Sequence, residues 1–309
     1  MVELILVKTA QRKRNVMKQD IILPINDHVF KILLSKNIPA LREFLTAVLD
    51  LPAEEFDELT VLDPVLTPEY INGKKVAVDI KLETKTGRRI HIDVQRRKYP
   101  SVWQRFLYYG SKMVVEQGKS GDSYASIRQV ICIILTDFRA YDYTEAWRHR
   151  VFLNDPNTGA HFPEGLEFYV LELPKIKGPD GTLLGDWMAF FNSKTEEQLM
   201  SIASSSPAIK ESVGTVKKLS GSERDRAIAL SMEMARMDME AAHYDGQQKG
   251  IEKGRQEGRQ EGRQEGRQEG LLDVASKMLR EKTEHAVIAR WTGLSPGEIK
   301  NLASQLGED

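Results

Sequence analysis

Residues 74–98, KKVAVDIKLETKTGRRIHIDVQRRK, alternate between apolar and polar side chains on both sides of a short loop. Successive side chains of a strand point to opposite faces, so two alternating segments joined by such a loop predict a β-hairpin. The apolar side chains are Val76, Val78, Ile80 and Leu82 in the first strand and Ile90, Ile92 and Val94 in the second. A one-residue slip in register would move the apolar side chains of one strand to the opposite face of the hairpin. The register must therefore place both apolar sets on one face.

The loop decides which polar residues lie opposite each other. A three-residue loop, Lys85-Thr86-Gly87, with the glycine at positive φ, pairs residue 84 with residue 88. In this register Asp79 lies directly across from Asp93. A two-residue loop, Thr86-Gly87, would set Asp79 against Val94 and mix the two faces, so we reject it.

Two carboxylates that face each other repel, because opposed Cβ atoms on a strand pair lie about 4.5–5.5 Å apart. A shared Mg²⁺ or Mn²⁺ ion would remove the repulsion, since these hard cations bind carboxylate oxygens, backbone carbonyls and water. The alternative is a solvated hairpin face on which Lys81 and His91 neutralise Asp79 and Asp93. The spacing alone leaves both interpretations open.

The order Asp79, then Asp93-Val94-Gln95, resembles the active-site signature of the PD-(D/E)xK nucleases. More narrowly, the chain resembles the recombination-promoting nuclease family, whose members are also described as transposases. The resemblance also rests on IILPINDHVFKIL near the start, WQRFLYYGSKM after the hairpin and the glycine-rich repeat of the C-terminal region. It is close over residues 19–175 and looser over the C-terminal part.

This resemblance implies a restriction-endonuclease-like core that hydrolyses DNA phosphodiester bonds with Mg²⁺, Mn²⁺ or another divalent cation, in recombination or element mobility. It implies Asp79 and Asp93 as catalytic metal ligands, the Val94 carbonyl as a third ligand, and Gln95 in the place of the superfamily's lysine. Asp93 is one methylene shorter than the family's more usual glutamate, and Gln95 carries no charge. Gln95 can still position water through hydrogen bonds. A catalytically weak or inactive DNA-binding or oligomeric interaction protein is therefore the alternative.

Asp27 is a further acidic candidate for the metal site. The alternative is a helix N-cap, because Asn26-Asp27 precedes residues with helical spacing, namely Val29, Phe30, Leu33 and Leu34.

Positive charge gathers around the hairpin. Residues 81–112 contain nine Lys and Arg residues against two acids, which suits a phosphate backbone. We expect DNA phosphate contacts from Arg96, Arg97 and Lys98, which directly follow Gln95. Arg105, in a predicted helix over 101–118, would contact phosphate or orient the metal site, or be a solvated charge or partner of an acid. The net charge of −1 argues against a protein that coats DNA generally.

The remaining pattern predicts an α/β fold, with a mixed sheet flanked by helices and a nuclease-like core over residues 19–195. Helices are expected over 27–35 and 38–49, and strands over 56–62, 149–155 and 166–174. The continuous apolar run within 128–138 predicts a central strand.

A helical C-terminal region follows the core. Residues 196–245 are expected to be helical, and residues 246–270 form a repeat with a glycine at every fourth position and four copies of GRQE. Glycine costs a helix about 1 kcal/mol relative to alanine, and like charges at i and i+4 repel, so the repeat is either a flexible linker or a helix that self-associates into a homo-oligomer.

Residues 271–309 have the spacing of a helix-turn-helix unit, with Ala289, Gly293 and Ile299 at the small, turn and apolar positions. Ser295-Pro296-Gly297-Glu298 predicts a capped helix start. The segment has five Lys and Arg residues against six acids, so we favour a packing module over a DNA reader.

The rest of the sequence points to a cytoplasmic protein without a membrane span. Cys132 is the single cysteine, which excludes a disulfide framework within the chain. No run reaches the eighteen or so apolar residues that a spanning helix needs. We expect residues 1–18 to be an N-terminal extension, with Met17 as the natural start.

Overall fold

The computed structural model describes residues 21–62, 65–66, 76–77, 79–118, 121, 123–160 and 165–307. The chain divides into two compact units, one up to Arg236 and the other from Met237 onward. Within the described ranges, no helix combines the length and apolar character needed to cross a membrane. The predicted extension, residues 1–18, lies outside the described residues.

A mixed sheet forms the centre of the first unit. Among the described residues it has six strands in the order β1-β4-β5-β6-β8-β7. Their bounds are β1 Thr60–Leu62, β4 Ile80–Glu83, β5 Arg89–Gln95, β6 Val130–Thr136, β7 Arg148–Val151 and β8 Leu166–Glu172. The strand β6 is parallel to both β5 and β8, and the other neighbouring pairs are antiparallel. The central place predicted for the apolar run around β6 is confirmed.

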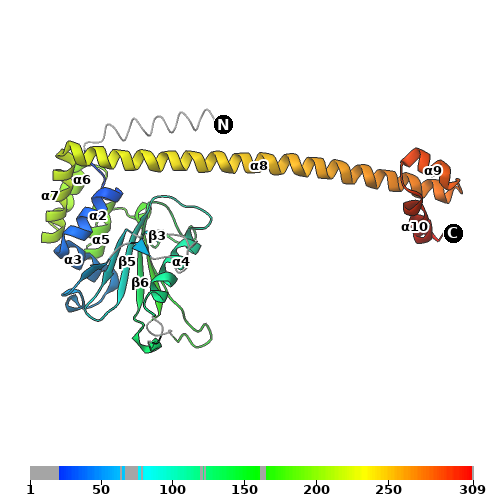
Figure 1. The fold of residues 1–309 in the computed structure, drawn as a ribbon. Helices are drawn as coiled ribbons and strands as arrows, with labels where there is room; N and C mark the ends of the chain where they lie inside the picture. The colour runs from blue at the N-terminus through cyan, green and yellow to red at the C-terminus, as the bar shows by residue number, and fades with distance from the viewer. Residues whose placement is uncertain are drawn as a thin grey trace. The chain divides into compact units, whose positions relative to one another are not determined.

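Helices cover both faces of this sheet (Figure 1). The helices of the first unit are α2 Asp27–Lys36, α3 Ile38–Leu49, α4 Val102–Val115, α5 Leu183–Asn192, α6 Glu196–Ile202, α7 Pro207–Gly221 and the first turns of α8 Glu223–Arg280. Short 3₁₀ helices are η1 Ala53–Phe56, η2 Tyr124–Ser126 and η3 Leu173–Lys175. The larger core lies between the sheet and α2, α3, α5, α6 and α7, whereas α4 packs on the opposite face. The predicted α/β class is confirmed.

Alternation along β5 explains how one strand serves both layers. Ile90, Ile92 and Val94 belong to the larger core, and the side chains between them face α4. The helix α4 comes close to the sheet at Gly110, where an added Cβ would lie 2.6 Å from Leu166 Cδ1 and 3.2 Å from Cys132 Sγ. The polar face of the hairpin is therefore buried by α4, and the solvated face considered above is wrong.

The hairpin has the register that the sequence predicts. The Thr84 N–H donates to the Arg88 carbonyl over 2.9 Å, Gly87 has φ of +85°, and Ile80 pairs with Ile92. The first strand, however, is not continuous. Asp79 lies at a bend between β4 and the short β3 (Val76–Ala77), which pairs with β2 (Val65–Leu66) in a separate sheet. Val78 lies outside the described residues.

Other boundaries also differ from the sequence prediction, and the strands expected over 149–155 and 166–174 end at Val151 and Glu172. The strand expected over 56–62 begins only at Thr60, because residues 53–56 form η1 and bury Phe56. The first unit also extends past residue 195, because α6, α7 and Ala229 of α8 contribute buried side chains to its larger core. Their many Glu, Met, Ala and Lys residues predict these later segments as helices, but composition does not say which core they join.

The second unit contains the remainder of α8, with α9 (His285–Thr292) and α10 (Pro296–Leu306). Its small core includes Leu279, Ile288 and Ile299. Gly293 ends α9 with φ of +72°, and Ser295 and Glu298 form the predicted capping box at the start of α10. The glycine repeat lies within the 58-residue helix α8, and its side chains over 246–270 are exposed in the single chain.

Candidate active site

Asp79 directly precedes β4, and its side chain accepts a hydrogen bond that a backbone carbonyl of a neighbouring strand would otherwise accept. Its Oδ2 accepts a hydrogen bond from the Val94 N–H over 3.0 Å. A backbone N–H at the end of a ladder needs such a partner, so the bend at Asp79 also directs the carboxylate towards β5. On the other side, Lys31 Nζ of α2 lies 3.5 Å from Asp79 Oδ1.

Asp93 lies on the face of β5 that α4 covers, and it is 3% exposed. Its Oδ2 accepts a hydrogen bond from Gln95 Nε2, two residues along the same face of the strand. His91 Nε2 lies 3.8 Å from Asp93 Oδ1, which is an ion-pair distance and too long for a hydrogen bond. His91 itself is buried, so it does not belong to a solvated hairpin face.

A chain of hydrogen bonds from α4 fixes the Gln95 amide. Arg105 Nη1 donates to the Tyr99 hydroxyl over 3.1 Å, and the Tyr99 hydroxyl donates to Gln95 Oε1 over 3.2 Å. Because a carboxylate only accepts, the NH₂ of Gln95 must face Asp93 and its oxygen must face Tyr99. Arg105 also lies over the Tyr109 ring at 5.0 Å, so it belongs to the buried network around Asp93 and is not a solvated helix charge.

The two carboxyl groups have pKa values shifted in opposite directions. Burial, and then the negative charge of Asp93, raises the pKa of Asp79 to about 6. Burial also acts to raise the pKa of Asp93, but His91, Gln95 and Arg105 outweigh it, and this pKa lies below its ordinary value. The cost of burying two neighbouring carboxylates therefore falls mainly on Asp79, whose ionised form is disfavoured.

Asp27 is not the N-cap of α2. The cap is Asn26, whose Oδ1 accepts a hydrogen bond from the His28 N–H over 3.1 Å, and Asp27 lies in the first helical turn. Burial raises the pKa of Asp27, whereas the positive charges of Arg96 and Lys31 oppose this shift. Asp27 also acts as a negative neighbour that raises the pKa of Asp79, so both lie in one acidic region.

The three cations after Gln95 have different surroundings. Arg96 is mostly buried, and its guanidinium pairs with Glu233 of α8. Arg97 lies 5.8 Å from the centre of the Tyr99 ring. Lys98 is exposed, where its Nζ lies 2.8 Å from Asp142 Oδ2. Lys98 is therefore the most exposed of the three, although its Nζ also donates to the Arg139 carbonyl over 3.0 Å.

The donor atoms at Asp79 and Asp93 suit a hard divalent cation. One oxygen of each carboxylate is used by Val94 or Gln95, and each Oδ1 remains outside these two hydrogen bonds. Within the described part of the chain, no group of three or more His, Cys, Asp or Glu side chains is placed to hold a metal ion. A metal here would thus rely on the two carboxylates, a backbone carbonyl such as that of Val94, and water.

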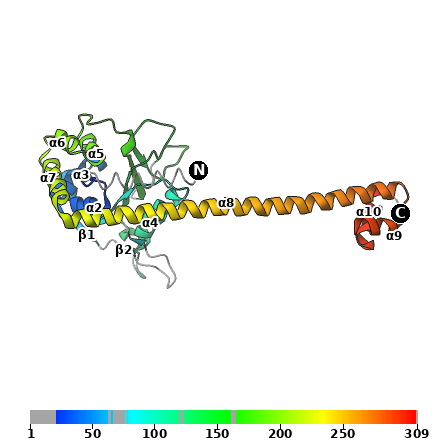
Figure 2. The same cartoon turned by 90° about the horizontal axis from the view of Figure 1, so that it is seen from above.

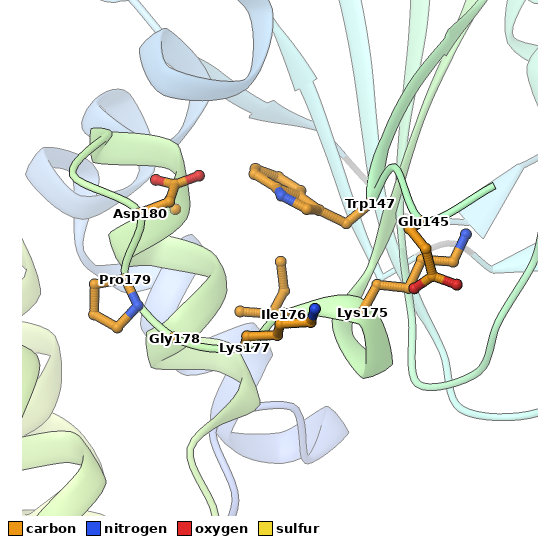
Figure 3. A pocket seen from close by; sticks show the side chains of 9 residues that line it. Glu145, Trp147, Lys175, Ile176, Lys177, Gly178, Pro179 and Asp180 are labelled. Carbon is orange, nitrogen blue, oxygen red and sulfur yellow. The ribbon is translucent and has the colours of Figure 1, made fainter.

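A pocket of about 360 Å³ lies elsewhere in the first unit (Figure 3). It is lined by Glu145, Trp147, Lys175, Ile176, Lys177, Gly178, Pro179, Asp180 and Gly185, none of which the sequence predicts as a site residue. Lys175 donates to Glu172 and to the carbonyls of Tyr141 and Ala146 over 2.7–3.1 Å. Its ammonium group is therefore fully engaged within the fold.

Sequence reasoning missed three residues near the acidic pair: Lys31, Tyr99 and Glu233. Lys31 lies one helical turn after Asp27, and this spacing is the one local signal that points to it. Tyr99 and Glu233 have no comparable signal, because their roles depend on contacts with Gln95 and Arg96 that only the fold creates.

Comparison with known proteins gives one match. No protein with curated annotation and no solved structure matches the chain. The sequence model of one protein family matches residues 24–245, more than two thirds of the chain, and this range includes Asp27, Asp79, Asp93 and Glu233. On this match, with the mixed sheet and the acidic pair at its hairpin, the chain belongs to the PD-(D/E)XK nuclease family transposases.

Proposed function

We propose that this protein is a metal-dependent DNA endonuclease that uses Mg²⁺ or Mn²⁺ held by Asp79, Asp93 and the Val94 carbonyl. The observation that carries the proposal is the electrostatic state of the pair. Two carboxylates are fixed side by side by Val94 and Gln95, and the pKa of Asp79 is raised to about 6 by burial and by Asp93. A divalent cation would remove this repulsion.

The bound cation would lower the pKa of a water ligand and polarise the phosphoryl oxygen for in-line attack. The protein's part is to hold the two carboxylates in place and to keep their orientation. The chain from Arg105 through Tyr99 and Gln95 does this for Asp93. Gln95 keeps one amide hydrogen and one lone pair beyond these contacts, so it can also position the attacking water.

DNA is the proposed substrate because positive charge adjoins the acidic pair. Lys98 is exposed just after β5, and Arg97 lies beside it. Both would contact the phosphates that flank the cleaved bond, at the cost of the ion pair between Lys98 and Asp142. Arg105 would orient Asp93 through Tyr99 and Gln95 and would not contact DNA. Arg96 would also not contact DNA, because its guanidinium pairs with Glu233. The setting would be recombination or the mobility of a genetic element, in the cytoplasm.

Plasmid nicking in Mn²⁺ or Mg²⁺ tests this activity directly. The variants Asp79→Ala and Asp93→Ala should each lower the rate at least about 100-fold, because each removes a metal ligand. Asp245→Ala, which removes an exposed aspartate of α8, is the matched control and should nick at the wild-type rate. Equal nicking by the wild type and both site variants would reject the mechanism and favour a DNA-binding or interaction protein.

The raised pKa of Asp79 predicts a pH-dependent stability in the absence of metal. The Asp79 carboxyl has a pKa of about 6 in the fold and an ordinary pKa of 3.8. Ionising it therefore costs more in the folded than in the unfolded chain, and the fold loses stability as the pH rises through about 6. Asp79→Asn keeps an acceptor for the Val94 N–H and removes the charge. In EDTA at about pH 8, the free energy of unfolding of Asp79→Asn should exceed that of the wild type by on the order of 3 kcal/mol. At about pH 4 the two proteins should have similar free energies of unfolding.

Urea unfolding across this pH range provides the measurement. Added Mg²⁺ should stabilise the wild type but not Asp79→Asn, because only the wild type would bind it in the folded state. A stability difference that does not change with pH would contradict the assigned pKa shift.

We also propose that α8 self-associates through its repeat. In the described chain, the Arg and Glu side chains of the four GRQE copies are exposed along the helix. A period of four residues advances about 40° around the helix with each copy, because an α-helix has 3.6 residues per turn. A straight partner helix would therefore contact only two or three copies of the repeat. A longer contact requires the two helices to wind around each other with a right-handed twist. A second copy offers a Glu row to each Arg row.

Light scattering tests this association. Replacing the four GRQE copies with a Gly/Ser linker of equal length should reduce the measured mass to that of one chain, since both charge rows are lost. Association through opposite charges should also weaken as salt is added. An unchanged mass in the linker variant would exclude the repeat as the interface.

A further inference from the structure

The first turns of α8 hold the segment that carries Asp27. Asp225 Oδ1 lies 2.8 Å from His28 Nε2, and the Ala229 carbonyl accepts a hydrogen bond from Asn26 Nδ2 over 3.4 Å. Glu233 comes next, and the three residues are spaced four apart on one face of the helix. Figures 1 and 2 both show the first turns of α8 near α2. The contacts join residues that are about two hundred positions apart in the sequence.

Glu233 is a buried carboxylate held by two guanidinium groups. Arg96 donates to its Oε2 through Nη1 and to its Oε1 through Nη2, the latter over 3.5 Å. Arg236, three residues further along α8, donates to both oxygens, over 3.3 Å from its Nε. These contacts lower the pKa of Glu233 against the opposing effect of burial. The cluster is ionised, and removing the carboxylate would leave two guanidinium groups facing each other.

Arg96 connects this cluster to the acidic pair. It is the residue after Gln95, at the end of β5, and the Gln95 carbonyl accepts a hydrogen bond from the Asp137 N–H over 2.8 Å. Arg96 is also the charged neighbour that most strongly opposes the raised pKa of Asp27. Its position therefore affects both the strand end that carries Asp93, Val94 and Gln95 and the charge beside Asp27.

We propose that Glu233 is a positioning residue of the active site, which holds Arg96 against the end of β5 and beside Asp27. Glu233 does not touch the reacting atoms in this account. It acts through Arg96, and the beginning of α8 is thereby part of the nuclease unit. The inference rests on the proposed nuclease function, because it concerns the alignment of that same site.

A double-mutant cycle in the full-length protein tests this assignment. Glu233→Ala should lower kcat for plasmid nicking by about 10- to 100-fold, while KM for DNA changes less than about twofold, since a displaced group costs rate more than binding. The affinity for Mn²⁺, measured by electron paramagnetic resonance, should fall as well. In an Arg96→Ala background, Glu233→Ala should have little further effect on either quantity, because its action passes through Arg96.

Glu252→Ala is the matched control, because Glu252 is an exposed glutamate on the same helix. It should behave as the wild type. If Glu233→Ala loses cooperative thermal unfolding, Glu233→Gln replaces it in the cycle, since glutamine keeps the volume and one acceptor oxygen for Arg96. The same non-additive result is then expected, with a smaller loss of kcat.

The outcomes separate the inference from the function on which it rests. If the wild type nicks DNA but Glu233→Ala does so equally well, or if the two substitutions have additive effects, the positioning role is overturned and the nuclease function stands. If the wild type neither binds Mn²⁺ nor nicks DNA, the proposed function fails and the inference fails with it.

Discussion

The repulsion between Asp79 and Asp93 is the interaction on which the rest of the site depends. The hairpin register and the bend before β4 bring the two carboxylates together, and the Val94 N–H and the Gln95 amide hold them there. Neither contact supplies a formal positive charge. Lys31 approaches Asp79 at 3.5 Å, yet the pKa of Asp79 is still raised to about 6. A fold that keeps this charge deficit is suited to a cation from solution.

The layers on the two sides of the sheet support this pair in different ways. From one side, α4 contributes Arg105, whose hydrogen bonds pass through Tyr99 to Gln95 and orient Asp93. From the other side, α2 contributes Asp27 and Lys31, and α8 holds the start of α2 through Asp225 and Ala229. A mixed sheet covered on both faces thus lets two separate layers act on one pair of carboxylates.

The sequence alone predicts the parts of this site that local periodicity determines. Alternation and the three-residue loop give the register that places Asp79 across from Asp93, and the apolar run at 130–136 gives the central strand. The break at Asp79 was not predictable, because the same alternation continues through Val76 and Ala77. Asn26 rather than Asp27 caps α2. Both residue types suit an N-cap, and the extended backbone at Asn26 decides between them, which the sequence does not reveal.

Tertiary contacts account for what remained hidden. Alternation shows that His91 and Asp93 share a face, but it does not show that α4 buries that face. Arg96 looks like a free cation beside Gln95 in the sequence, whereas in the fold it pairs with a glutamate 137 residues away. The family match covers residues 24–245 and so includes that glutamate, but it assigns no role to it.

Anomalous diffraction from crystals grown with Mn²⁺ tests the central claim most directly, because it locates the metal without relying on activity. The account predicts a peak about 2 Å from a carboxylate oxygen of both Asp79 and Asp93, and the loss of this peak in Asp79→Asn crystals. A peak bound by other residues, or no peak between these two carboxylates at saturating Mn²⁺, would contradict it.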